Sequence, residues 1–273
     1  MVELWTGDSM SYKLIHGDCL EVMPTLADKS IDAVICDLPY GTTNCSWDSV
    51  IPFEPLWVQY KRLIKPRGAI VLFGSQPFTS ALVMSNIEWF KYEWIWKKTH
   101  ATGQLNLNVR PMTEHENICV FASGKTTYNL QMTKKPKDKI RAPTRMGMSD
   151  CYGAQREYDR TVPIDMRSPT TVLQFGSVNH GERGYHPTQK PIDLLAYLIR
   201  TYTNEGETIL DNTMGSGSTI VAAIQEGRNA IGIERDADYF TIAQQRCLEA
   251  TYQPSLFTPQ PTQWEPVAMF GDD

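Results

Sequence analysis

Two short segments of this sequence carry side chains that could take part in chemistry. In the first, Asp37-Leu38-Pro39-Tyr40, a proline lies between a carboxylate and an aromatic ring. Proline fixes its own backbone and restricts the preceding residue to an extended conformation. The Asp37 carboxylate and the Leu38 carbonyl could therefore face one crevice, with the Tyr40 ring beside them. Two hydrogen-bond acceptors and a flat ring are suited to holding an aromatic amine.

Such an amine is a poor nucleophile, because its nitrogen lone pair is delocalised into the ring. Hydrogen bonds from its two N–H groups to Asp37 and to the Leu38 carbonyl would favour a pyramidal nitrogen. The lone pair would then be free for in-line attack on an activated methyl group, and orientation of the two bound reactants would supply much of the rate. The segment therefore predicts methylation of an exocyclic amino group.

The second segment is glycine-rich and covers residues 211–219, with the sequence DNTMGSGST. Its glycines let a ligand approach the backbone and leave free N–H groups at the start of a helix, although an ordinary tight turn would need the same residues. Glu234 follows Gly217 by 17 residues, at the end of the next expected strand, where a carboxylate can accept hydrogen bonds from ribose hydroxyls. Because the third glycine of a dinucleotide site and the lysine of a phosphate loop are missing, we expect an adenosine with a small zwitterionic tail.

The elements that position these segments follow from the apolar pattern. Both segments come directly after short apolar runs, and the carboxyl ends of such strands are where open α/β sheets place ligands. Helical patterns separate the runs, which favours a doubly wound α/β sheet, whereas the polar residues 97–116 are expected to be irregular. The seven predicted strands are residues 12–16, 31–36, 69–73, 92–96, 117–121, 208–211 and 230–233.

Composition sets the class of protein. The 273 residues are 41% hydrophobic and 21% charged, as in an ordinary soluble α/β protein. No run of eighteen apolar residues is present, so no membrane span is expected, and the first residues lack the pattern of a signal peptide. The six cysteines are scattered, so we expect free thiols in a reducing compartment and no zinc site.

Charge is distributed unevenly along the chain. A net charge of −5 is unusual for a protein that holds DNA through its phosphates. Residues 134–145 nevertheless contain six basic side chains and one acid, which indicates either a solvated loop or a surface for a polyanion. The six are Lys134, Lys135, Lys137, Lys139, Arg141 and Arg145.

A third segment, His186-Pro187-Thr188-Gln189-Lys190-Pro191, completes a pattern that resembles the DNA methyltransferases acting on base amino groups. That family carries a D-P-P-Y or S-P-P-Y motif, a glycine-rich cofactor motif and an H-P-T-Q-K-P segment. The order found here, with the catalytic motif first, is similar to the beta group of the family. The sequence departs from the family pattern at Leu38, which replaces a proline, and at Asn212 and Thr213, which replace Pro-Phe.

The resemblance implies a fold and a cofactor. The fold would be a seven-stranded, mostly parallel sheet with helices on both faces, Rossmann-like, with one antiparallel strand near an edge. The methyl donor would be S-adenosyl-L-methionine, with Asp18 at its adenine amino group, Asp211 at its own amino group and Glu234 at its ribose. Thr188 and Lys190 would lie near its methionine end. The predicted cofactor-binding residues are Asp18, Thr188, Lys190, Asp211, Thr213, Gly215, Gly217, Ser218 and Glu234, and the predicted catalytic residues are Asp37, Leu38, Pro39 and Tyr40.

The same resemblance divides the chain. Residues 1–124 would form the catalytic half and residues 186–250 the cofactor-binding half of one methyltransferase domain. Residues 125–185 would be the variable target recognition region, whose basic run would contact DNA phosphates. Residues 251–273 would be an irregular tail.

We therefore expect site-specific methylation of adenine N6 in double-stranded DNA, with the target base flipped out of the helix. Asp37 favours adenine, because cytosine-N4 enzymes of this group more often carry Ser there. The alternatives are cytosine-N4 methylation and a catalytically inactive DNA-binding relative; methylation of RNA or protein glutamine usually goes with Asn at this position. We expect no metal, because residues 114–116 lack a third ligand. The resemblance also suggests a homodimer, a restriction-modification role, and the cytoplasm of a bacterial or phage-infected cell.

Overall fold

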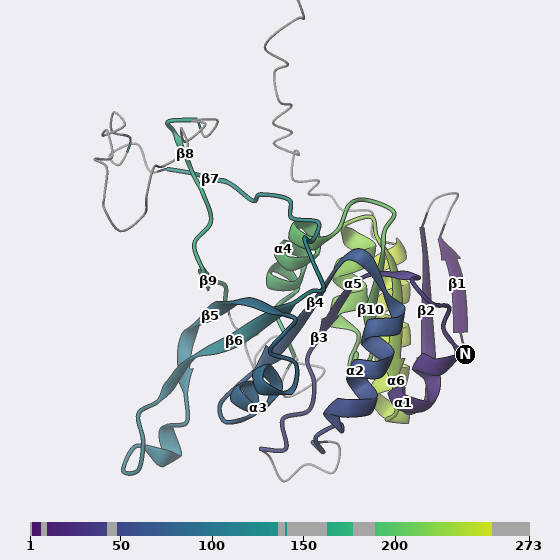
Figure 1. Ribbon diagram of the computed structural model, residues 1–273, viewed down its shortest axis with the longest axis horizontal. Helices are drawn as coiled ribbons and strands as arrows, with labels where there is room; N and C mark the ends of the chain where they lie inside the picture. The colour runs from purple at the N-terminus through teal and green to yellow at the C-terminus, as the bar shows by residue number, and fades with distance from the viewer. Residues whose placement is uncertain are drawn as a thin grey trace, which may run out of the picture.

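The structure is a computed structural model that describes residues 2–6, 10–42, 48–135, 140, 163–176 and 189–252 (Figure 1). Within these residues nine strands form one sheet, in the order β1-β2-β11-β10-β3-β4-β6-β5-β9. The strands are β1 (Val2–Thr6), β2 (Met10–His16), β3 (Ile31–Cys36), β4 (Ile64–Gly74), β5 (Phe90–Thr102), β6 (Thr113–Phe121), β9 (Val172–Gln174), β10 (Thr208–Asp211) and β11 (Asn229–Glu234), and β7 (Thr133–Lys134) pairs separately with β8 (Met166–Arg167).

All seven predicted strands are present and form the continuous centre of the sheet, from β2 to β5. Neighbours from β2 to β4 run parallel, and β6 is antiparallel to both β4 and β5. The expected single antiparallel strand near an edge is thus β6. The structure adds one strand at each edge, antiparallel β1 beside β2 and parallel β9 beside β5.

Helices cover both faces of the sheet, and Figure 1 shows the two groups on opposite sides of the strands. On β3, Ala33 and Ile35 pack on one side while Val34 and Cys36 pack on the other, and all four are fully buried. Burial on both faces explains why residues 33–36 of this strand are all apolar. One layer is α1 (Cys19–Val22), α2 (Phe53–Leu63) and α3 (Phe78–Ser85), and the other is α4 (Ile192–Tyr202), α5 (Ser218–Gln225) and α6 (Ala237–Tyr252).

The expectation that residues 97–116 are irregular holds for residues 103–112 and is wrong for the two ends of the segment. β5 continues to Thr102 and β6 begins at Thr113, with the pairs Lys97–His115 and Thr102–Thr113 extending the ladder. Cross-strand pairing decides the conformation here, and the local polar composition does not reveal it. The two strands leave the body of the sheet as a long hairpin (Figure 1).

The order of the central strands brings the two candidate segments together. β3 and β10 are parallel neighbours, paired at Ile209–Ala33 and Leu210–Val34. Residues that follow these strands therefore leave the sheet at the same edge. In the described part of the chain, no helix is long and apolar enough to cross a membrane.

Candidate functional site

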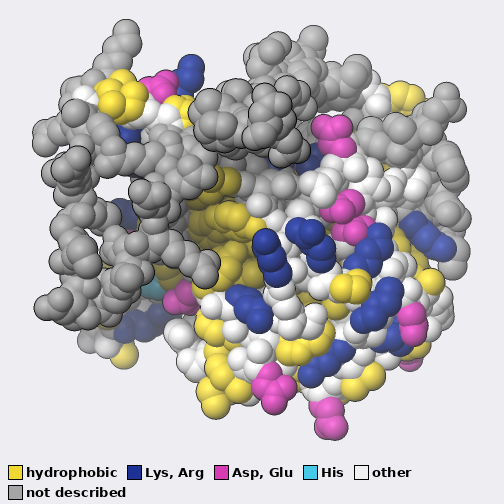
Figure 2. All heavy atoms as spheres, turned by 45° about the horizontal axis from the view of Figure 1, so that its top comes forward, with side chains coloured by type: hydrophobic (Ala, Val, Ile, Leu, Met, Phe, Trp, Pro, Cys, Tyr) yellow, Lys and Arg dark blue, Asp and Glu magenta, His cyan; other side chains and the backbone are white. Residues whose placement is uncertain are grey.

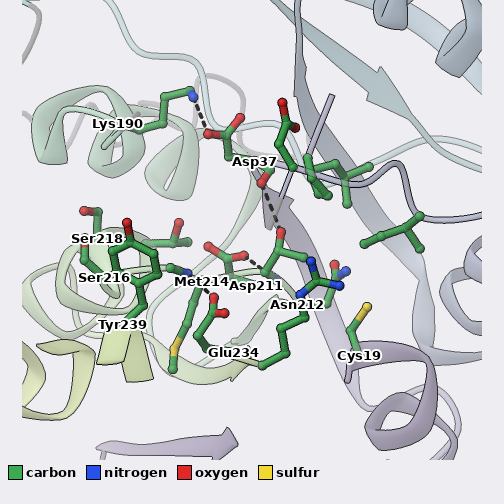
Figure 3. A pocket seen from close by; sticks show the side chains of 18 of the residues that line it. Cys19, Asp37, Lys190, Asp211, Asn212, Met214, Ser216, Ser218, Glu234 and Tyr239 are labelled. Carbon is green, nitrogen blue, oxygen red and sulfur yellow. Dashed lines mark hydrogen bonds and ion pairs between the residues drawn. The ribbon is translucent and has the colours of Figure 1, made fainter. Parts of the chain in front are cut away.

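A cavity opens at the carboxyl ends of β3, β10 and β11 (Figure 3). Its walls include all of the proline turn (residues 37–40) and most of the glycine turn (residues 211–217). Segments that are far apart in the sequence therefore share one cavity. Other predicted residues on its walls are Asp18, Lys190, Ser218 and Glu234.

Thr213 ties the two turns together. Its hydroxyl donates to the backbone oxygen of Asp37 at 3.0 Å and lies 2.9 Å from the Cys36 sulfur. Its backbone N–H donates to an Asp211 carboxylate oxygen at 3.1 Å. The threonine that departs from the family pattern thus forms a direct polar link between the end of β3 and the glycine turn.

The Asp37 carboxylate lies between a hydroxyl and an ammonium group. The Tyr40 hydroxyl donates to Oδ1 at 2.6 Å, and Lys190 forms an ion pair with Oδ2. Burial raises the pKa of Asp37 above its ordinary value, and the positive charge of Lys190 opposes that rise. Both carboxylate oxygens therefore already have a partner, and an incoming amino group must share an oxygen with that partner or displace it.

The Tyr40 ring is fixed by its neighbours. It packs against Phe78 of α3 with ring centroids 5.0 Å apart, and the Lys190 ammonium lies 6.0 Å from its centroid. Burial and the neighbouring Asp37 raise the pKa of the Tyr40 hydroxyl well above its usual value. The hydroxyl therefore remains a proton donor, and one ring face can serve as a stacking platform.

Lys190 has a second carboxylate within reach. Its ammonium is 3.4 Å from Oε2 of Glu116 on β6, and Oε1 of Glu116 is 2.6 Å from the Lys98 ammonium. From the sequence, Glu116 is rejected as a metal ligand and no other role is predicted for it. Among the described residues, no group of three or more His, Cys, Asp or Glu side chains is placed to hold a metal ion.

Glu234 and the glycine turn hold each other in place. One carboxylate oxygen of Glu234 accepts from the Gly215 N–H at 2.9 Å, and the other accepts from the Asp236 N–H at 2.8 Å. The Glu234 carbonyl accepts from the Gly17 N–H at 2.9 Å. The predicted ribose-binding carboxylate is therefore fixed at the cavity wall by backbone donors.

Asp211 is the most perturbed carboxylate of the predicted cofactor set. It lines the cavity but is only 3% exposed, and burial raises its pKa from 3.8 to about 6. A buried carboxylate without a strong positive partner is costly in the free protein. This position is suited to a ligand that brings its own positive charge.

Gly217 lies outside the cavity wall, unlike the other predicted glycine, Gly215. Its φ is +82°, and a Cβ atom would lie 3.0 Å from the Cβ of Ala243 on α6. The structure thus gives this glycine a packing role between α5 and α6. Arg246 of α6 supports the same turn, because its guanidinium donates to the Ser216 carbonyl at 2.5 Å and to the Ser218 hydroxyl at 3.1 Å.

Three residues support the cavity through contacts that the sequence did not predict. The Asn212 side chain, 1% exposed, accepts from the Tyr60 hydroxyl of α2 at 2.6 Å. Asp48 accepts from the backbone N–H groups of Gly41 and Thr42, which directly follow the proline turn. Asp18 caps α1 by accepting from the Leu20 N–H at 2.8 Å while it lines the cavity.

Part of the predicted set lies outside the described residues, namely Thr188, Lys137, Lys139, Arg141 and Arg145. Lys134 is exposed on β7, and the Lys135 ammonium donates to the Ile164 carbonyl at 2.9 Å. β7 and β8 stand apart from the main sheet in Figure 1. On the face drawn in Figure 2, basic side chains are interspersed with acidic ones.

Comparisons with known proteins support a single family. The family model described as DNA methylase, the N6/N4 methyltransferases, matches residues 31–245. The type II methyltransferase M.HpaI of Haemophilus parainfluenzae is 29% identical over 254 residues, covering 87% of this chain and 74% of that protein. M.HinfI of Haemophilus influenzae is 26% identical over 271 residues, covering 89% of this chain and 70% of that protein.

Solved structures agree with the fold. The complex of M1.HpyAVI with S-adenosylmethionine (SAM) is 25% identical, with a TM-score of 0.57, and covers 86% of this chain and 99% of that one. The cytosine-N4-specific PvuII DNA methyltransferase has a TM-score of 0.60 at 15% identity, covering 90% of this chain and 95% of that one. At that identity the likeness concerns the fold alone.

Proposed function

The chain belongs to the N6/N4 DNA methylase family, which includes adenine and cytosine enzymes, and from Asp37 at the first position of the proline turn we propose that its target is adenine, methylated at N6. It is a site-specific DNA methyltransferase that uses S-adenosylmethionine. The observation that carries the proposal is the cavity shared by the proline turn and the glycine turn, linked by Thr213. Amine acceptors and the cofactor site are thereby held at a fixed separation, as catalysis by orientation requires.

The proline turn would receive the base. A base flipped out of the duplex would stack on Tyr40, and its amino group would donate to Asp37 and to the Leu38 carbonyl. These bonds would localise the nitrogen lone pair toward the cofactor. Thr213 would hold the Asp37 backbone during transfer. Pro39 would keep Leu38 extended.

The cavity fits S-adenosylmethionine, which would supply an electrophilic methyl group on a sulfonium. The buried Asp211 carboxylate, with its pKa raised to about 6, is suited to the amino group of the cofactor. Glu234 would accept from the ribose hydroxyls, and Asp18 would accept from the adenine amino group. The residues assigned beside them by the family motifs are Thr188, Lys190, Thr213, Gly215, Gly217 and Ser218.

Asp37 supports adenine over cytosine, because the family resemblance associates Ser at this position with cytosine-N4 enzymes. Residues 125–185 would read the target sequence as a separate recognition region. Their basic side chains, including Lys134 and Lys135, would contact phosphates and set register while other side chains read base edges.

The test is a methyl-transfer assay with tritiated cofactor and unmethylated duplex DNA of mixed sequence, followed by nucleoside chromatography. We expect label in N6-methyl-2′-deoxyadenosine with the native chain and at least a hundredfold loss in Asp37→Ala, with cofactor binding retained. Asp28→Ala, which removes an exposed carboxylate paired with Arg62, is the matched control. Label in N4-methylcytosine would replace adenine as the target, and DNA binding without any label would identify an inactive relative.

A further inference from the structure

Four charged side chains form an alternating row that ends at the proline turn. Lys98, Glu116, Lys190 and Asp37 follow one another, with separations of 2.6 Å from Lys98 to Glu116 and 3.4 Å from Glu116 to Lys190, and with a direct ion pair between Lys190 and Asp37. Figure 3 shows Lys190 pointing at Asp37. Two ammonium groups and two carboxylates balance, which is how largely buried charges are tolerated.

The two carboxylates next to Lys190 differ in how they are used. Asp37 is occupied on both oxygens, by the Tyr40 hydroxyl and by the Lys190 ammonium. Glu116 holds Lys98 on one oxygen, while its buried Oε2 has no hydrogen bond within the described residues and faces Lys190 at 3.4 Å. A shift of about 0.6 Å would bring the ammonium to the usual charge-assisted hydrogen-bond distance from Oε2.

We propose that Glu116 is a positioning residue that takes over the Lys190 ammonium when the amino group of the target base binds Asp37. The proposal rests on the proposed function, because it assigns the second position of Lys190 during the same methyl transfer. Without Glu116 the ammonium would stay on Asp37 and compete with the base for its oxygens. Glu116 does not line the cavity, so it acts through Lys190 and not on the cofactor or the base.

The charges that face Asp37 determine how its pKa, and with it the pH dependence of methyl transfer, should change when Glu116 is replaced. Lys190 lowers the pKa of Asp37, and Glu116 raises it by repulsion. Asp211, on the neighbouring strand, also interacts with Asp37 electrostatically. Burial alone would raise the pKa of Glu116, but Lys190 and Lys98 lower it, so Glu116 stays ionised. Removing its charge therefore lowers the pKa of Asp37.

The experiment compares the rate of a single methyl transfer, with DNA and cofactor both saturating, in the native chain, Glu116→Gln and Glu93→Gln. Glu93 is the matched control, because it is a carboxylate on the adjacent strand β5 that accepts from Asn117. Glu116→Gln should lower the maximal rate about tenfold or more. In a plot of this rate against pH, the fall in rate on the acid side (the acid limb) should move to lower pH in Glu116→Gln. The dissociation constant of the cofactor should stay within about twofold of the native value, a shift of at most about 0.4 kcal/mol.

Glu116→Asp keeps the charge and should recover much of the rate together with the native acid limb. A Glu116→Gln variant that folds, binds cofactor and keeps both the native rate and the native acid limb would overturn the proposal, as would equal rate losses in Glu93→Gln. If Glu116→Gln lowers the melting temperature and the native rate returns at low temperature, the role of Glu116 is only to stabilise the fold. If the native chain itself transfers no methyl group to DNA, the proposed function is wrong, whatever the variants do.

Discussion

Asp211→Asn should make the ligand-free protein more stable at neutral pH while weakening its hold on the cofactor. Burial raises the pKa of Asp211 from 3.8 to about 6 in the folded chain. A shift of about two units corresponds to roughly 3 kcal/mol between the two protonation states. Because the folded chain favours the protonated acid, this cost to stability is absent below pH 4, grows as pH rises, and is complete above about pH 6.

Asparagine has nearly the same shape and can still accept from the Thr213 N–H. Removing the buried charge should therefore raise the unfolding free energy by up to about 3 kcal/mol at pH 8, or about 6 to 12 °C in melting temperature. Near pH 4 the gain should almost vanish. Cofactor affinity should fall by about tenfold to a hundredfold, because a hydrogen bond to a charged amino group is lost.

Urea unfolding of both proteins at pH 4.5 and pH 8 measures the first effect, and calorimetric titration with the cofactor measures the second. Asp193→Asn, which removes an exposed carboxylate on α4, is the control and should show no comparable gain at pH 8. A stabilisation equal at the two pH values, or a loss of stability at pH 8, would refute the reasoning from burial. Unchanged cofactor affinity in Asp211→Asn would leave the pKa argument standing and remove Asp211 from the binding set.

Three further substitutions test the supports of the site. Thr213→Val removes the hydroxyl that donates to the Asp37 backbone and should slow methyl transfer about tenfold, whereas Thr213→Ser should restore it in the same rate assay. Tyr40→Phe keeps the ring but loses the bond to Asp37, so turnover should fall about fivefold to tenfold with cofactor titration unchanged. Arg246→Met releases the Ser216 carbonyl and should weaken cofactor binding about tenfold, while the rate at saturating cofactor stays near the native value.

The central sheet could be predicted because its strands are buried on both faces. β3 and β10 read as short apolar runs, and polar residues follow at their carboxyl ends. The rule that parallel strands place ligands at those ends predicted the common edge, and the structure brings the two turns to one cavity there. The edge strand β9 is only three residues long and has no such pattern, so its pairing with β5 depends on tertiary contacts.

The contacts that support the site could not be predicted, because they join residues far apart in the chain. Lys190 and Asp37 are separated by 153 positions, and nothing in either segment names the other as its partner. Glu116 reaches Lys190 only because β5 and β6 form a long ladder where the composition indicated an irregular segment. The sequence assigned Glu116 no role once a metal at residues 114–116 was rejected, and the structure shows that its partners are Lys98 and Lys190.

The two residues of the glycine turn that depart from the family pattern tie this turn to α2 and to the end of β3. A Pro-Phe pair at these positions could make no side-chain hydrogen bonds, but Asn212 accepts from the Tyr60 hydroxyl of α2 and Thr213 donates to the Asp37 backbone. Both bonds join the glycine turn to residues 152 and 176 positions earlier in the chain. A buried acceptor or hydroxyl is costly without a partner, so the Asn212 oxygen and the Thr213 hydroxyl each depend on the distant group that they contact. The Thr213 hydroxyl therefore links the position of the glycine turn directly to that of the Asp37 backbone.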